Sequence, residues 1–148
     1  MDEPVELRRA EKPDLEDIST LLRESRLPVD GLSDALAHAV VASSGRRIVG
    51  CVALELHDGV ALLRSLAVSA NARGRGLGAR LTREALEMAR TLGTRDVYLL
   101  TETARDFFPR FGFAVEDRAA APVALRSSVE FRSACPASAV VMHARVAR

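Results

Sequence analysis

The sequence predicts a mixed α/β fold with a central, mostly antiparallel sheet that contains one parallel strand pair and is flanked by helices. Segments that alternate as strands do come before residue 69, an amphipathic helical pattern begins at Leu77, and a short apolar stretch follows at residues 97–100. A strand, a crossover helix and a second strand together imply a parallel pair. The 148 residues are enough for one compact domain, so residues 1–148 are expected to form a single domain.

The expected elements follow from apolar periodicity and from the residues that break it. Pro13 suits the first turn of a helix, Asp58 and Gly59 suit a turn between strands, and Gly93 and Gly112 suit helix ends. Strands are expected at residues 5–8, 40–42, 48–57, 60–68, 97–100 and 139–146, and helices at residues 13–22, 32–39, 77–92, 107–111 and 122–131.

The composition argues against several classes of partner. The formal net charge is only +1, so no overall field favours nucleic acid or an anionic membrane. The longest apolar runs are far too short to span a bilayer, and the start of the chain has no apolar signal segment, so a cytoplasmic protein is expected. Cys51 and Cys135 are too few and too far apart for a disulfide framework or a metal-ligand pair; reduced thiols and no metal are expected.

A glycine-rich loop at residues 73–78 follows a predicted strand and opens a predicted helix. Backbone N–H groups and the helix dipole converge there on one point that attracts an anion. A nucleoside-triphosphate loop would need a lysine, which is missing. Gly74, Gly76 and Ala79 do satisfy a dinucleotide-binding pattern, but Glu102 lies too far along the chain for its acidic residue, and an antiparallel meander comes before the loop.

A third interpretation rests on a resemblance. The pattern Arg73-x-x-Gly76-x-Gly78, after Leu66-Ala67-Val68 and before an amphipathic helix, resembles the acetyl-CoA signature of the GNAT superfamily of N-acetyltransferases, and Phe107-Phe108-x-x-x-Gly112-Phe113 extends the likeness. Residues 61–68 and 98–108 are similar to the arsenic-resistance N-acetyltransferases and to the acetyltransferase domain of N-acetylglutamate synthases. These relatives acylate small amino-acid-like amines.

The resemblance implies acetyl-CoA as cosubstrate and assigns the residues that would hold it. Main-chain groups of the strand end would pair with the pantetheine arm, amides of the loop would hold the pyrophosphate, Arg73 would add charge, and Phe108 would pack on the pantetheine. The implied cofactor residues are Leu66, Ala67, Val68, Arg73, Gly74, Arg75, Gly76, Leu77, Gly78, Ala79 and Phe108.

Acetyl transfer needs a neutral amine and stabilisation of the departing thiolate. The superfamily often places a glutamate base on the strand that leads into Leu66, but residues 61–65 contain no carboxylate, so Glu55 is the nearest substitute, ahead of His57 and Glu102. Phe108 stands where the family's usual tyrosine acid would be and cannot give a proton. Ser138, a water or the substrate's own ammonium proton are the alternatives.

The acceptor is expected to be a small amino-acid-like molecule with a primary amine, with arsenic- or phosphorus-containing analogues among the candidates. Arg64 could bind its carboxylate, and Ser65 could line the same cleft, although strand alternation separates the two unless a bulge intervenes. A homodimer is a further expectation. The competing hypothesis, from a different class, is a non-catalytic acyl-CoA-binding sensor.

Overall fold

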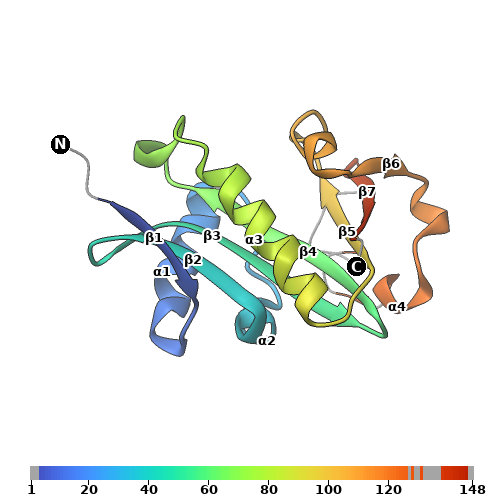
Figure 1. Ribbon diagram of the computed structural model, residues 1–148, viewed down its shortest axis with the longest axis horizontal. Helices are drawn as coiled ribbons and strands as arrows, with labels where there is room; N and C mark the ends of the chain where they lie inside the picture. The colour runs from blue at the N-terminus through green and yellow to red at the C-terminus, as the bar shows by residue number, and fades with distance from the viewer. Residues whose placement is uncertain (1–3, 127, 129–130, 132–137, 147–148) are drawn as a thin grey trace.

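A computed structural model describes residues 4–126, 128, 131 and 138–146 of the chain. The bounds of its elements are β1 Val5–Arg9, η1 Lys12–Asp14, α1 Leu15–Glu24, α2 Leu32–Ala35, η2 Leu36–His38, β2 Ala39–Ser44, β3 Arg47–His57, β4 Val60–Val68, η3 Ala70–Ala72, α3 Leu77–Thr91, β5 Asp96–Thr101, η4 Phe108–Phe111, β6 Ala114–Glu116, η5 Arg118–Ala120, α4 Val123–Arg126 and β7 Val140–Arg145. Figure 1 labels the α-helices and the strands among them. Part of the helix expected at residues 122–131, and Cys135, lie outside the described residues.

The strands form one seven-stranded sheet in the order β1-β2-β3-β4-β5-β7-β6. Every neighbouring pair is antiparallel except β4 and β5, which the crossover helix α3 makes parallel. The predicted fold class is therefore confirmed. The structure adds β6, which the sequence analysis missed because three residues are too few to show an alternating pattern.

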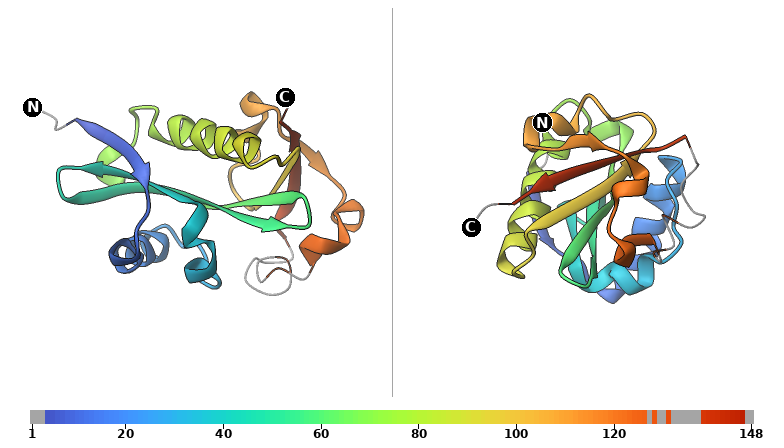
Figure 2. Two further views of the ribbon diagram at one scale, coloured as in Figure 1. Left: turned by 60° about the horizontal axis from the view of Figure 1, so that its bottom comes forward. Right: turned by 90° about the vertical axis from the view of Figure 1, so that its right-hand side faces the viewer.

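Helices cover both faces of the sheet, as the views in Figure 2 show. α3 lies on one face, and α1 and α2 lie on the other. The stripe that α3 turns toward the sheet is the apolar face expected from its periodicity. Its buried residues are Leu77, Leu81, Thr82, Ala85, Leu86, Met88 and Ala89.

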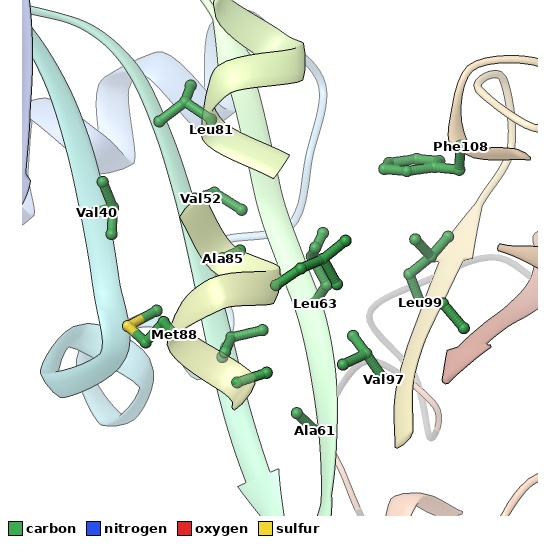
Figure 3. Close-up of a cluster of buried hydrophobic side chains, with 14 of the residues drawn as sticks. Val40, Val52, Ala61, Leu63, Leu81, Ala85, Met88, Val97, Leu99 and Phe108 are labelled. Carbon is green, nitrogen blue, oxygen red and sulfur yellow. The ribbon is translucent and has the colours of Figure 1, made fainter. Parts of the chain in front are cut away.

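The main hydrophobic core lies between α3 and the sheet. Figure 3 shows Leu81, Ala85 and Met88 of α3 above strands β2 to β5, with Leu63 of β4 and Leu99 of β5 in the same cluster. Because residues of α3, β4 and β5 belong to this one cluster, the core joins the two halves of the sheet. A separate cluster under α1 and α2 fills the opposite face.

An ion pair fastens the edge strand β1 to the helix that follows it. Both oxygens of Asp14 accept hydrogen bonds from Arg8, at 2.8 and 3.0 Å, and Oδ2 also accepts from the amide of Glu11 at 2.7 Å. The hydrogen bonds from Arg8 hold the pKa of Asp14 below its usual range, against the opposing effect of burial. A lowered folded-state pKa means stability that is present above the unfolded value near pH 4 and is lost as the pH falls below it.

We therefore expect Asp14→Asn to lower the free energy of unfolding at pH 7 by about 1–3 kcal/mol, because a charge-assisted pair of hydrogen bonds is broken. Urea titrations between pH 3 and 7 measure this. The difference between wild type and variant should shrink toward the acid end. A difference that stayed constant with pH would show that the Asp14 charge contributes nothing.

Candidate active site

A cleft opens where β4 and β5 separate. The two strands pair only at Val60 with Asp96, Ala61 with Val97, and Leu62 with Tyr98. Beyond these pairs lies a pocket of about 240 Å³, in the space between the two strands where their pairing stops. It is lined by Ser25, Leu27, Pro28, Leu63, Arg64, Ser65, Leu66, Ala67, Val68, Arg73, Leu99, Leu100, Thr101, Thr103, Ala104 and Phe108.

The cofactor loop continues from one end of this cleft into α3. Gly74 and Gly76 adopt positive φ angles of 83° and 75°, in the left-handed region that glycine enters without strain. The amide of Arg80 donates to the carbonyl of Gly76 at 3.1 Å. The amides of Leu77, Gly78 and Ala79 come before the first such bond and have no acceptor within the helix, as at any α-helix N-terminus. They are therefore available to an anion.

The structure separates the cofactor residues implied by sequence into two groups. Leu66, Ala67, Val68, Arg73 and Phe108 line the cleft itself. The remaining residues form the loop and first helical turn that lead away from Arg73: Gly74, Arg75, Gly76, Leu77, Gly78 and Ala79. The cleft and the loop are thus adjacent, as a molecule with a long arm and a phosphate end would require.

Arg73 links the strand end to the loop. Its Nε donates to the carbonyl of Val68 at 3.1 Å, and the exposed side chain borders the cleft. Arg75 is held more loosely, with Nη2 donating to the carbonyl of Asn71 at 3.4 Å. Both arginines lie close to the α3 N-terminus, where positive charge adds to the attraction for an anion.

A bulge in β4 shapes the middle of the cleft. Cys51 pairs with Ala67 and Ala53 pairs with Arg64, so the single residue between them on β3 faces both Ser65 and Leu66. Ser65 has a φ of 62°, which is unusual for a buried strand residue other than glycine. The extra residue changes which face the following side chains point to.

The bulge removes the separation that strand alternation implied for Arg64 and Ser65. Arg64 Nε donates to Ser65 Oγ at 3.0 Å, so the two side chains meet on one face, and both line the cleft. On the opposite face, Leu63 and Leu66 both contact the core beneath α3, although a regular strand would point residues three apart in opposite directions.

Cys51 supports the bulge from β3. Its thiol donates to the carbonyl of Ser65 at 3.2 Å. Burial raises the pKa of the Cys51 thiol to about 12, so the group stays protonated and donates this bond at neutral pH. Cys51 therefore has a structural role beside the cleft.

Arg64 is completely buried at its side chain and its nitrogens are engaged within the protein. Besides Ser65, the guanidinium donates to Glu55 Oε2 at 2.7 Å and to the carbonyl of Pro28 at 3.4 Å. These bonds occupy all three of its nitrogens. Each bond uses one N–H of the five that a guanidinium carries, so Arg64 is held in place by protein partners beside the cleft that it lines.

Glu55, the residue predicted as the base, lies behind Arg64. Its Oε2 accepts from Arg64, and its Oε1 lies 2.8 Å from His57 Nε2. Glu55 and His57 line a second hollow of about 350 Å³, together with Gly31, Asp34, His38, Leu54, Leu56 and Ser128. The lining of the main cleft, within the described residues, includes no carboxylate and no imidazole.

Phe108 closes the far side of the cleft as an apolar wall. It is 5% exposed and packs edge-on against Phe107 and Phe113, at centroid distances of 5.1 and 5.6 Å. Ser138 and Glu102, the weaker acid and base candidates, are exposed and do not line the cleft. Ser25, Thr101 and Thr103 do line it. Thr101 and Thr103 fall in the stretch that resembles the relatives, whereas nothing in the sequence pointed to Ser25.

Comparison with protein families decides the class. A family model described as an acetyltransferase (GNAT) domain matches residues 35–115, which include the meander, the loop, α3 and the phenylalanine cluster. The chain belongs to the GNAT acetyltransferase family. This membership confirms the resemblance found in the sequence and the expected class, the acetyl-CoA-dependent N-acetyltransferases. Comparison with curated protein sequences finds no match.

Solved structures share the GNAT fold over nearly the whole chain. N-acetylglutamate synthase from Neisseria gonorrhoeae, in complex with coenzyme A and N-acetyl-glutamate, matches with a TM-score of 0.83 and 21% identity, over 100% of this chain and 36% of the synthase. Rv2747 from Mycobacterium tuberculosis, in complex with CoA and NLQ, matches with a TM-score of 0.81 and 23% identity, over 96% of this chain and 99% of Rv2747.

PaiA N-acetyltransferase from Thermoplasma acidophilum, in complex with coenzyme A, matches with a TM-score of 0.74 and 17% identity, over 96% of this chain and 99% of that chain. The chain spans only about a third of the length of the N-acetylglutamate synthases. At these identities the likeness concerns the fold. The coenzyme A in these complexes agrees with acetyl-CoA as the cosubstrate of the GNAT family.

The described residues contain neither a metal-binding cluster nor a membrane-spanning helix. No group of three or more histidine, cysteine, aspartate or glutamate side chains in this part of the chain is arranged to hold a metal ion. Among the same residues, no helix has both the length and the apolar character needed to cross a membrane.

Proposed function

We propose that this GNAT chain transfers the acetyl group of acetyl-CoA to the primary amine of a small amino-acid-like acceptor. The observation that carries the proposal is the cleft itself, with an unpaired β4 edge from Leu63 to Val68 that leads to the open N-terminus of α3. A pantetheine arm would pair with that edge, and the pyrophosphate would meet the helix amides.

The other end of the cleft favours an acceptor that carries negative charge. Arg73 belongs to the loop end, so the charged residue in the rest of the lining is Arg64, and the other polar side chains there are the hydroxyl-bearing Ser25, Ser65, Thr101 and Thr103. A carboxylate is better accommodated by such a lining than a second cationic group would be. Arsenic- and phosphorus-containing amino-acid analogues also carry anionic oxygens, and we include them among the proposed acceptors.

The test is the release of free thiol from acetyl-CoA in the presence of amino acids and their phosphinic and arsenical analogues. Amine-dependent release, with N-acetylation of the acceptor confirmed by mass spectrometry, would support the proposal. Tight binding of acetyl-CoA without release by any amine would contradict it. Simple amines that lack a carboxylate are the matched controls and should react more slowly than the corresponding amino acids.

A non-catalytic acyl-CoA sensor is the second candidate, and a specific observation favours it. The cleft brings neither the expected acid nor the expected base to its surface, because Phe108 has no hydroxyl and Glu55 lies behind Arg64. Binding of acetyl-CoA that is tighter than binding of CoA, with no transfer to any amine, would support this alternative. An acyl-group preference of that kind would not be needed by an enzyme that releases CoA.

The same geometry leads to a prediction for pH dependence. If no base in the cleft removes the ammonium proton, kcat/KM should rise with pH in proportion to the neutral amine, up to the acceptor's own pKa. Glu55→Gln should then lower kcat/KM less than 10-fold and leave the shape of this profile unchanged, whereas loss of a true base costs about 10²–10⁴-fold. Steady-state kinetics from pH 6 to 10 would decide between the two.

A homodimer and a cytoplasmic location complete the proposal. Light scattering coupled to size-exclusion chromatography measures the first, and localisation of the tagged full-length protein in cells measures the second. A role in arsenic resistance is tested separately, by growth of cells that do or do not express the chain in the presence of an arsenical amino acid. Equal growth would argue against that role without affecting the acetyltransferase proposal.

A further inference from the structure

Both oxygen atoms of Ser65, the carbonyl and the hydroxyl, accept hydrogen bonds that hold the residue in place. Its carbonyl accepts the thiol of Cys51 at 3.2 Å, and its hydroxyl oxygen accepts Nε–H of Arg64 at 3.0 Å. The residue is 8% exposed and occupies the left-handed region, with a φ of 62°. Such a conformation persists only where the surroundings impose it, and it occurs preferentially at functional sites.

The hydrogen bond from Arg64 fixes the polarity of the Ser65 hydroxyl. A guanidinium has donors but no acceptor, so the Ser65 oxygen must be the acceptor in this bond. The hydroxyl proton is then left for another partner, and the hydrogen bonds among the described residues include none that uses it. Since Ser65 lines the cleft, the proton is available to whatever occupies it.

Arg64 also makes this proton a stronger donor. Donation of a hydrogen bond to a hydroxyl oxygen polarises its O–H bond, and the effect is larger when the donor is charged and the surroundings are dry. The Arg64 side chain is 0% exposed, and Glu55 and Pro28 hold its remaining nitrogens. The arginine is therefore held beside Ser65 by partners within the protein.

We propose that Ser65 is the residue that recognises the acceptor's carboxylate, by donating its hydroxyl proton, and that Arg64 is a positioning residue that acts through Ser65. The inference rests on the proposed function, because it names a contact with the acceptor of the acetyl group. It divides between two residues a role that the sequence alone assigned to Arg64. The expected contact is a single short O–H···O⁻ bond in a buried site.

The test is a calorimetric titration of the CoA-saturated protein, in which no turnover occurs. The probes are L-glutamate and a phosphinic analogue of glutamate, each compared with its own α-carboxamide. Wild type should bind the carboxylates more tightly than the carboxamides. Ser65→Ala should weaken carboxylate binding about 10-fold, leave carboxamide binding nearly unchanged, and so remove the discrimination.

Two further variants guard against loss of the fold. Ser65→Gly lacks the hydroxyl but suits the positive φ, and Arg64→Lys keeps the charge beside Glu55 but has no Nε–H directed at Ser65. Ser33→Ala makes the same chemical change at an exposed serine of α2 and should change nothing. Thermal unfolding of each variant confirms that the fold is retained.

A double-mutant cycle separates positioning from direct contact. If Arg64 acts through Ser65, then Arg64→Lys should weaken carboxylate binding in wild type but add almost nothing once Ser65 is alanine. Additive losses would show that Arg64 touches the carboxylate and would overturn the proposal. Unchanged carboxylate affinity in both Ser65 variants would also overturn it. So would a wild type that binds the carboxylate probes no better than the carboxamides, or that binds neither kind of probe.

Thiol release by wild type with the same probes keeps the two proposals apart. Release by wild type with discrimination unaffected by Ser65→Ala would leave the acetyltransferase standing and overturn the role of Ser65. Discrimination lost in Ser65→Ala, without release by wild type, would support the role of Ser65 and count against the enzyme.

Discussion

Gly78→Asp is expected to weaken the binding of coenzyme A about 100-fold while leaving the protein as stable as before or slightly more so. Gly78 is the second residue of α3, and its φ is not positive. A carboxylate there would occupy the position where the pyrophosphate meets the helix amides. About 100-fold corresponds to roughly 2.7 kcal/mol, a size that like charges a few ångströms apart near a protein surface readily reach.

The opposite sign of the two effects is what makes this variant informative. A negative side chain in the first turn of a helix stabilises it by about 0.3–1 kcal/mol, and any residue other than proline is a better helix former than glycine. A Cβ at this position would come no closer than 3.5 Å to Phe107 Cζ, which is ordinary contact. The fold therefore has room for the change.

Calorimetric titration with coenzyme A and urea unfolding measure the two quantities. Gly78→Asn is the matched control, since it has nearly the same shape without the charge, and its affinity should fall only a few-fold. Raising the salt concentration should narrow the gap between the two variants. Equal affinities for the aspartate and asparagine variants would place the pyrophosphate somewhere other than the start of α3.

The second large effect concerns the close approach of α3 to β3 at Gly50. A Cβ on Gly50 would lie 2.9 Å from Leu81 Cδ1 and 3.3 Å from the carbonyl oxygen of Ala67. Leu81 itself is 0% exposed. Gly50→Ala is expected to lower the free energy of unfolding by about 1–3 kcal/mol through overpacking, and Leu81→Ala by about 2–5 kcal/mol through loss of buried surface and the cavity it leaves.

The two changes should compensate one another in part. The methyl group at position 50 would occupy space that Leu81→Ala vacates, so the double variant should be more stable than the sum of the single losses predicts, by about 1 kcal/mol. Leu125→Ala, in a separate cluster with Leu62, Tyr98 and Val141, is the control, and its loss should simply add to that of Gly50→Ala. Strict additivity for Gly50 and Leu81 would show that α3 moves away from the sheet to relieve the clash.

The sequence was sufficient to predict most of the fold because the main elements carry strong local patterns. α3 has an apolar stripe ended by Gly93, and β3 and β4 flank a turn of two residues at Asp58 and Gly59. The parallel pair followed from connectivity alone. β6 was missed because it is only three residues long and forms through its pairing with β7, a long-range contact that leaves no local pattern in the sequence.

The interior of the cleft was harder to predict because it depends on register. No local pattern indicates that Ser65 is an extra residue relative to β3, and this one offset brings it beside Arg64. Sequence proximity to the β4 edge suggested Glu55 as base, but Arg64 lies between that carboxylate and the cleft. The face of the sheet to which a polar side chain points depends on strand register and bulges, and the local sequence does not reveal these.

The sheet consists of two parts, β1 to β4 and β5 to β7, that pair directly only along the short contact between β4 and β5. Three residue pairs join the two parts at one end. On the α3 side, core side chains that include Leu63 of β4 and Leu99 of β5 join them where the strands are separated. Leu63 and Leu99 belong to the core beneath α3 and also line the cleft. We therefore expect a substitution in that core to alter the width of the cleft, even where the substituted residue touches no ligand.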